Sequence, residues 1–255
     1  MKGIIAIAKN TFKELVRQKI FFIIVIFGFS LLFISFFLYS LSVGEQSKII
    51  RDFGLSAITF FNTILVIIVG GSLLHKEFDK RTIYLIVTTP VERREIIIGK
   101  FFGFLVLILI NIIGMSIFHQ ILIFLTDGKF DLKIFIALYP FIFEISIIIS
   151  ILIFFSTFTG VIFSAFMGFI FYVIGHLIES LKLFSEISKS LFLKIISYFL
   201  YYFLPNLEHF NIKNNIVYGE IPKKEYFLFS TSYGLIYIIL LLYISSLIFE
   251  KKEFK

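Results

Sequence analysis

The sequence predicts an all-α integral membrane protein with six transmembrane helices. The 255-residue chain has a mean hydropathy of +1.00 and only 16% charged residues, a composition that excludes a soluble globule. Its apolar runs are continuous for about twenty residues, whereas barrel strands alternate in polarity. Backbone polar groups in hydrocarbon must be satisfied within their own segment, so these runs are expected to be helices.

The first element, residues 1–19, is expected to be an amphipathic helix lying at the membrane interface. Helical spacing gathers its apolar residues on one face: Ile4, Ile5, Ala8, Phe12, Leu15 and Val16. The opposite face carries Lys2, Lys9, Lys13 and Arg17. The alternative is an ordinary basic flank of the first span.

Six apolar runs are long enough to cross about 30 Å of hydrocarbon. They cover residues 20–43, 54–74, 101–125, 134–156, 160–179 and 229–249, within a single transmembrane domain of residues 1–255. The first run is too long for the core of a signal peptide, and no small-residue cleavage site follows it. It is expected to remain in the mature protein.

Basic residues predict the orientation of the spans. They concentrate near both termini and in residues 75–100, whereas the short loops 44–53 and 126–133 hold fewer. By the positive-inside rule, both termini and residues 75–100 are cytoplasmic. The sequence thus predicts a multi-pass membrane protein, with its positive charge directed at headgroups rather than nucleic acid.

Residues 180–228 are expected to form an external segment. The apolar run 191–204 is too short for a span and suits a re-entrant or interfacial helix. As a seventh span it would put the basic C-terminus outside, against the charge rule. The asparagine, glycine and proline residues between Pro205 and Pro222 then predict a loop.

Residues 75–100 form a charged segment between two apolar runs. It mixes four acids with six bases, and mixed charge favours a specific protein partner over lipid alone. Thr89-Pro90-Val91-Glu92 has the form of a capping box with proline at the first helical position, which predicts a helix starting at Pro90. The alternative is a solvated loop that only fixes topology.

This segment resembles the region after the second span in permease subunits of ABC-2-type exporters. The matching positions are Thr82, Ile86, Thr88, Pro90, Arg93, Glu95, Gly99 and Lys100. Many members place glycine before the threonine, where this chain has Arg81. The Lys80-Arg81-Thr82 form is similar to the subgroup of permeases for multicopper-enzyme (nitrous oxide reductase) maturation.

The resemblance implies that residues 75–100 couple the permease to a separate ABC ATPase subunit. The implied contacts are Lys76, Glu77, Lys80, Arg81, Thr82, Pro90, Arg93 and Glu95. It also implies a location in a prokaryotic cytoplasmic (inner) membrane. The implied partners are a second permease copy, in a homodimer or heterodimer, membrane lipids and an accessory protein on the outer side. The chain contains no G-x-x-x-x-G-K-[ST] motif, so ATP and Mg²⁺ are expected on the ATPase subunit and no cofactor on this chain.

Polar residues within the spans are candidates for a substrate path or a dimer interface. Glu144 lies about 15 Å into the fourth span, where a carboxyl group should face the bundle or a wet cavity. Pro140, one turn earlier, frees a backbone carbonyl. The further candidates are His119, His176, Asn62 and Asn111. The alternative is a structural role, with Glu144 as an internally paired acid and the histidines and asparagines as interhelical hydrogen-bonding residues.

The alternatives to a permease subunit are an intramembrane hydrolase and a secondary transporter. An intramembrane hydrolase would need a nucleophile motif, but Gly28-x-Ser30 and Gly114-x-Ser116 lack the second glycine, and 75–79 is not H-E-x-x-H. A secondary transporter would show paired broken helices. With no cysteine and three methionines, neither a metal site nor copper as cargo is favoured.

Overall fold

The computed structural model describes residues 2–41, 45–74, 92–187 and 191–251, and the regular elements within these ranges are all helical. Six helices are long and apolar enough to cross a membrane. They are α2 (Lys19–Leu41), α3 (Gln46–Gly70), α6 (Arg93–Asp127), α7 (Lys133–Ser156), α8 (Val161–Ile187) and α11 (Lys224–Lys251). The predicted all-α membrane fold with six transmembrane helices is confirmed.

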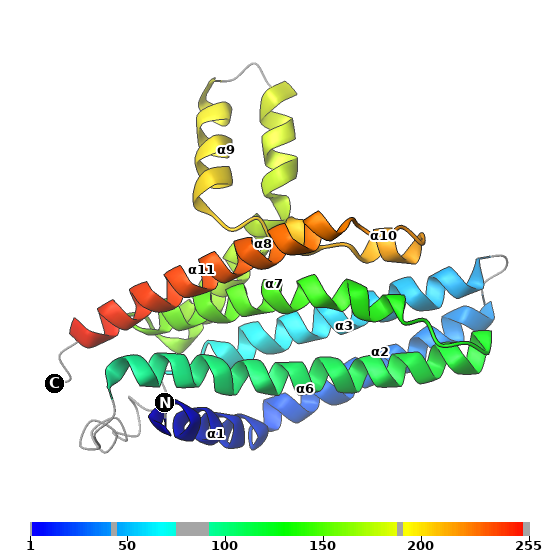
Figure 1. Cartoon of the computed structure of the whole chain (residues 1–255), viewed down its shortest axis with the longest axis horizontal. Helices are drawn as coiled ribbons and strands as arrows, with labels where there is room; N and C mark the ends of the chain where they lie inside the picture. Colours follow the sequence, from blue (N-terminus) through cyan, green and yellow to red (C-terminus); the bar gives the residue numbers. More distant parts are fainter. Residues whose placement is uncertain (1, 42–44, 75–91, 188–190, 252–255) are drawn as a thin grey trace.

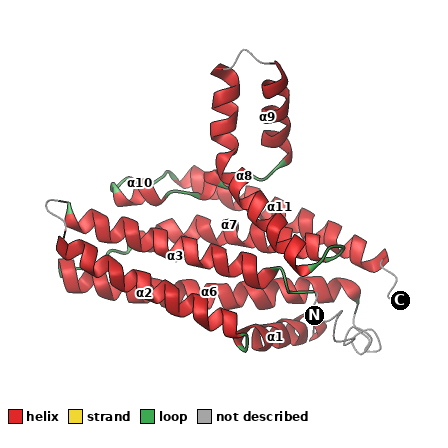
Figure 2. Ribbon diagram, turned by 180° about the vertical axis from the view of Figure 1, so that it is seen from behind, coloured by secondary structure: helices red, strands yellow, loops and turns green. Residues whose placement is uncertain are grey.

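The long helices lie side by side in a bundle, with both chain termini at the same end (Figure 1). Helices α3, α6 and α7 are largely enclosed, and α7 is the most buried of the six. Helices α2, α8 and α11 lie at the periphery, as the view from behind also shows (Figure 2). The buried polar residues Asn62, Asn111, His119 and Glu144 all lie on these three inner helices.

Helix α1 (Lys2–Val16) packs along α6 through a glycine face. A Cβ added at Gly103 would lie 2.5 Å from the Ala8 carbonyl oxygen and 2.8 Å from Thr11 Cβ, so only glycine allows this approach. The face turned to α6 includes Thr11, which is 3% exposed, whereas Ile5 is 65% exposed. The side chain of Ile5 is therefore exposed outside the bundle, and the predicted placement of this apolar face at the membrane interface stays a prediction.

The C-terminal part of α8 stands out of the bundle with α9 (Leu191–Phe203) as a helical hairpin (Figure 1). This agrees with the predicted short helix between the fifth and sixth spans. Leu183, Phe184 and Phe192 are exposed on the hairpin. The ammonium of Lys182 on α8 lies 4.1 Å from the ring centroid of Tyr201 on α9, a cation–π contact that joins the two helices.

The segment that follows the hairpin returns to the bundle. It contains a 3-10 helix, η1 (Glu208–Phe210), and the short helix α10 (Lys213–Val217), where the sequence predicted a loop. Four apolar side chains explain the difference, because burying them holds the segment against the core. They are Leu207, Phe210, Ile212 and Ile216, each no more than 5% exposed.

Candidate functional site

The structure describes only the two ends of the predicted coupling segment, residues 75–100. Residues 75–91 lie outside the described residues, and with them the predicted contacts Lys76, Glu77, Lys80, Arg81, Thr82 and Pro90. The structure describes the chain up to Leu74, just after α3, and again from Glu92, just before α6. These two ends form the base of the segment.

Helix α6 begins at Arg93, not at Pro90 as the capping-box pattern predicted. Glu92 has an extended backbone with φ −68° and ψ 143°, and its side chain makes no capping hydrogen bond. Arg93 instead donates from Nη1 to the Glu250 carbonyl oxygen at 2.7 Å and to that of Phe249 at 3.3 Å. The last carbonyls of a helix lack intrahelical donors, so this arginine satisfies the C-terminal end of α11.

Two neighbouring charged residues also bond within the chain. Arg94 Nε donates to Glu250 Oε1 at 2.5 Å, an ion pair between α6 and α11. The Glu95 carboxylate lies against Gly3 of α1. The start of α6 therefore contacts α1 and α11 together, while ATPase docking by Arg93 and Glu95 stays a prediction.

Lys100 of α6 joins the two ends of the charged segment through a hydrogen bond. Its side chain is only 1% exposed, and its ammonium donates to the Leu73 carbonyl oxygen at 2.5 Å. A buried ammonium is costly unless it is hydrogen-bonded, so this contact is strongly favoured over alternatives that leave the charge unpaired. Lys100 thereby joins the first turns of α6 to the chain just beyond α3.

The structure brings Glu144 and His176 together and adds a third group. His176 Nε2 lies 3.1 Å from Glu144 Oε1, and His176 Nδ1 lies 2.7 Å from Glu208 Oε2. Glu144 is 4% exposed, as expected of an acid that faces the bundle. An imidazolium would donate to both carboxylates at once, leaving one net negative charge on the three groups.

Glu208 reaches His176 because two backbones approach closely one residue earlier in each segment. The Leu207 amide donates to the Gly175 carbonyl oxygen at 3.0 Å, and a Cβ at Gly175 would lie 2.6 Å from Leu207 Cγ. Glu208 was not among the residues predicted for the site, because the pattern of residues 205–222 predicts an external loop. The spacing of buried apolar residues around it was the available signal.

Further polar groups border this cluster. Asn211 Nδ2 donates to Glu208 Oε1 at 3.0 Å, and Lys213 Nζ donates to Thr59 Oγ1 at 3.1 Å. Within the described part of the chain, the buried Asn211 Oδ1 has no hydrogen-bond partner. The segment after the hairpin thus brings an acid, an amide and an ammonium to the middle of α3, α7 and α8.

The remaining candidates lie in two other places. Asn111 Nδ2 donates to Asn62 Oδ1 at 2.9 Å, which joins α6 to α3, and Asn62 Nδ2 donates to the Ile58 carbonyl oxygen at 2.8 Å. His119 is apart from His176 and places Nε2 3.0 Å from the Ile50 carbonyl oxygen. Among the described residues, no group of three histidine, aspartate or glutamate side chains is placed to hold a metal ion.

One serine–histidine pair bears on the hydrolase alternative. Ser230 Oγ lies 3.2 Å from His209 Nε2. A nucleophile–base pair needs a third group that orients the base. None of the hydrogen bonds among the described residues joins the other His209 nitrogen to a carboxylate, so the pair does not extend to a triad.

These features define a polytopic helical membrane protein with polar contacts between its spans. A family model described as "ABC-2 family transporter protein" matches residues 9–175, more than half of the chain. The chain therefore belongs to the ABC-2 transporter family. The matched region contains the charged segment and Glu144, and it ends one residue before His176. A comparison with curated proteins returned no match.

Proposed function

We propose that the chain is the membrane-spanning permease subunit of an ATP-driven exporter. ATP and Mg²⁺ are held by a separate ABC ATPase subunit, and a second permease copy, identical or related, completes the transmembrane unit. Membership of the ABC-2 family supports this division, as does a sequence without a phosphate-binding loop. Both termini and residues 75–100 face the cytoplasm of a prokaryotic cell.

The anchored base of residues 75–91 is the observation that carries this proposal. Lys100 bonds the chain after α3, and Arg93 and Arg94 bond the end of α11. A displacement applied to the segment by a partner would reach α3, α6 and α11 together. Packed helices move as rigid bodies between discrete arrangements, so such a linkage can convert ATP-driven closure of the partner into movement of the spans.

The polar residues between the spans are the proposed path or dimer contacts. Glu144, His176, His119, Asn62 and Asn111 keep this role, and Glu208 joins them through His176. Ionisable groups inside a membrane are costly and are retained where they face a cavity or a partner. Their placement between α3, α6, α7 and α8 supports a polar route through the bundle.

Two features of the sequence bear on the cargo. The Lys80-Arg81-Thr82 form supports the subgroup of multicopper-enzyme maturation permeases. A chain with no cysteine and three methionines offers few soft ligands, which disfavours copper itself. The proposed cargo is instead a lipid, a peptide, a sulfur species or a small hydrophobic compound, none of which requires soft metal ligands.

Charge reversal in the segment tests the proposal. The tagged chain is purified from its source cells, and co-purifying polypeptides with a phosphate-binding loop are identified by mass spectrometry. We expect Glu77→Lys combined with Arg81→Glu to abolish this co-purification while membrane insertion stays normal. The matched control is Lys129→Glu with Glu225→Lys, which reverses two exposed charges outside the segment. Unchanged co-purification and transport in the Glu77/Arg81 variant would overturn the coupling role.

A further inference from the structure

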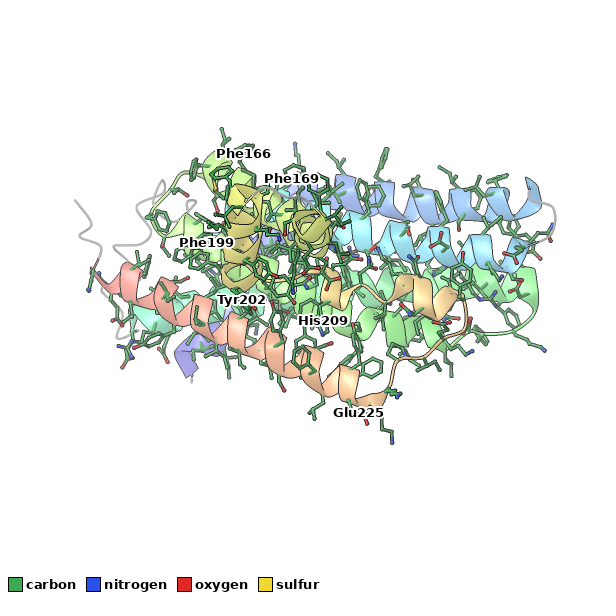
Figure 3. All side chains as sticks on the ribbon, turned by 90° about the horizontal axis from the view of Figure 1, so that it is seen from above. Phe166, Phe169, Phe199, Tyr202, His209 and Glu225 are labelled. Carbon is green, nitrogen blue, oxygen red and sulfur yellow. The ribbon has the colours of Figure 1, made fainter. Side chains whose placement is uncertain are left out.

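A small aromatic cavity lies at the foot of the α8–α9 hairpin, against α11. Its volume is about 250 Å³, and ring-bearing side chains from three elements line it. Tyr201 and Tyr202 come from α9, His209 from η1, and Tyr233 and Tyr237 from α11. Figure 3 looks down on this region and labels Tyr202 and His209 near the foot of the hairpin.

The rings hold one another in place. Tyr233 and Tyr237 have ring centroids 4.9 Å apart, and Phe229, which also lines the cavity, stacks on Tyr233 at 6.2 Å. The Asn206 backbone amide donates to the Tyr233 hydroxyl oxygen at 2.8 Å, which holds the Tyr233 ring against the chain that follows α9. Aromatic pairs in offset or edge-to-face contact stabilise each other beyond the area they bury. The cavity is therefore a built feature of three packed elements.

One acid completes the lining. Glu179 of α8 borders the cavity, and its Oε1 accepts a hydrogen bond from Asn206 Nδ2 at 2.8 Å. Burial lowers the pKa of His209, so its imidazole is neutral at neutral pH and adds no positive charge. The cavity thus combines aromatic side chains with one carboxylate.

We propose that this cavity binds an alkylammonium group. Ring faces attract a cation through their quadrupole, and several rings around one site form the aromatic cages that bind quaternary ammonium ligands. The structure already contains one such contact, because the Lys182 ammonium lies 4.1 Å from the Tyr201 ring centroid. The ammonium could belong to a lipid headgroup or to a soluble organic cation. This inference concerns a site separate from the charged segment, so it stands whether or not the coupling role holds.

The test uses the full chain in nanodiscs of phosphatidylglycerol, which contains no ammonium, titrated with choline chloride in a calorimeter. We expect saturable binding that Tyr201→Leu weakens about tenfold and Tyr201→Phe weakens less than about threefold, because phenylalanine keeps a ring face. Glu179→Gln should weaken binding, whereas Lys182→Gln should strengthen it by removing a competing cation. An anion site would reverse the last two effects and overturn the proposal.

Two substitutions elsewhere serve as controls. Tyr218→Leu removes an exposed tyrosine and Glu225→Gln an exposed acid, and neither residue lines the cavity, so both should leave choline binding unchanged. Equal losses in the controls and the cavity variants, or no saturable binding, would refute the site. Adding phosphatidylethanolamine to the nanodiscs separates the two sources: competition with choline identifies a lipid headgroup, and undiminished choline binding identifies a soluble cation.

Discussion

The ammonium of Lys100 donates a hydrogen bond to the carbonyl oxygen of Leu73 across 2.5 Å. This contact joins the first turns of α6 to the chain that follows α3. Residues 75–91 connect the same two places, so both ends of that segment are held together at its base. Arg93 and Arg94, at the start of α6, donate hydrogen bonds to Glu250 of α11.

Lys100→Met should destabilise the protein by about 1.5–3 kcal/mol, since a hydrogen bond from a charged group to a buried carbonyl is lost. Methionine has a similar length and an unbranched apolar side chain, but it carries no ammonium. Thermal unfolding in detergent, followed by gel filtration, measures the effect. Lys129→Met is the control, because Lys129 is exposed and its loss should change little. Equal stability of the two variants would show that the Lys100–Leu73 contact is not important.

Gly103→Ala should loosen α1 from α6. The added Cβ would meet the Ala8 carbonyl oxygen at 2.5 Å, and a backbone atom cannot move away without shifting the helix. We expect faster proteolysis within residues 2–16 and a lower unfolding temperature. Gly114→Ala on the same helix is the matched control, because its nearest neighbour would be 3.9 Å away. There alanine should stabilise the helix by up to about 1 kcal/mol. Similar behaviour of the two variants would contradict the close packing.

His176→Leu should be among the most destabilising substitutions in the bundle. It leaves Glu144, 4% exposed, without its imidazole partner, and breaking one side of a buried pair costs about 3–5 kcal/mol. Adding Glu144→Gln removes the uncompensated charge and should recover part of the loss. A double-mutant cycle on unfolding temperatures measures this coupling. Strictly additive effects would show that the two residues do not interact.

Protonation of His209 should lower the stability of the folded protein at acid pH. Burial lowers the pKa of His209 below the 6.5 of a free imidazole, so the unfolded chain takes up this proton at a higher pH than the folded one. The contribution to stability is complete above pH 6.5 and is lost as the pH falls through the folded pKa. His209→Gln should flatten the fall in unfolding temperature between about pH 7.5 and about pH 5. An unchanged acid slope would contradict this.

The sequence predicted the helices well because apolar runs of this length have few alternatives in a membrane. The depth of Glu144 in its span also predicted that its side chain faces the bundle, since an ionisable group in contact with lipid is costly. The start of α6 was missed, because the capping box at Thr89–Glu92 is a local signal. The contacts of Arg93 with α11 depend on residues about 160 positions away, which no local pattern contains.

The sequence alone also could not predict the hydrogen-bond partners of the membrane-embedded residues. Glu208 belongs to a segment rich in asparagine and proline, which predicts a loop, yet tertiary packing of Leu207 and Phe210 brings it to His176. The aromatic cavity joins α9 to α11 across a fold in the chain. The residues of such a site come from different helices that pack together. The pattern of a single sequence indicates where each helix forms, but not which helices are neighbours.

A cross-link from the charged segment tests the central claim most directly. The chain has no cysteine, so Arg81→Cys supplies a single thiol for a maleimide–benzophenone reagent, and Lys129→Cys supplies one in the loop between α6 and α7. If residues 75–100 dock on an ATPase subunit, irradiation should link position 81 to a polypeptide with a phosphate-binding loop and leave position 129 unlinked. Cross-linking of that polypeptide from position 129, with none from position 81, would contradict the coupling role of the segment.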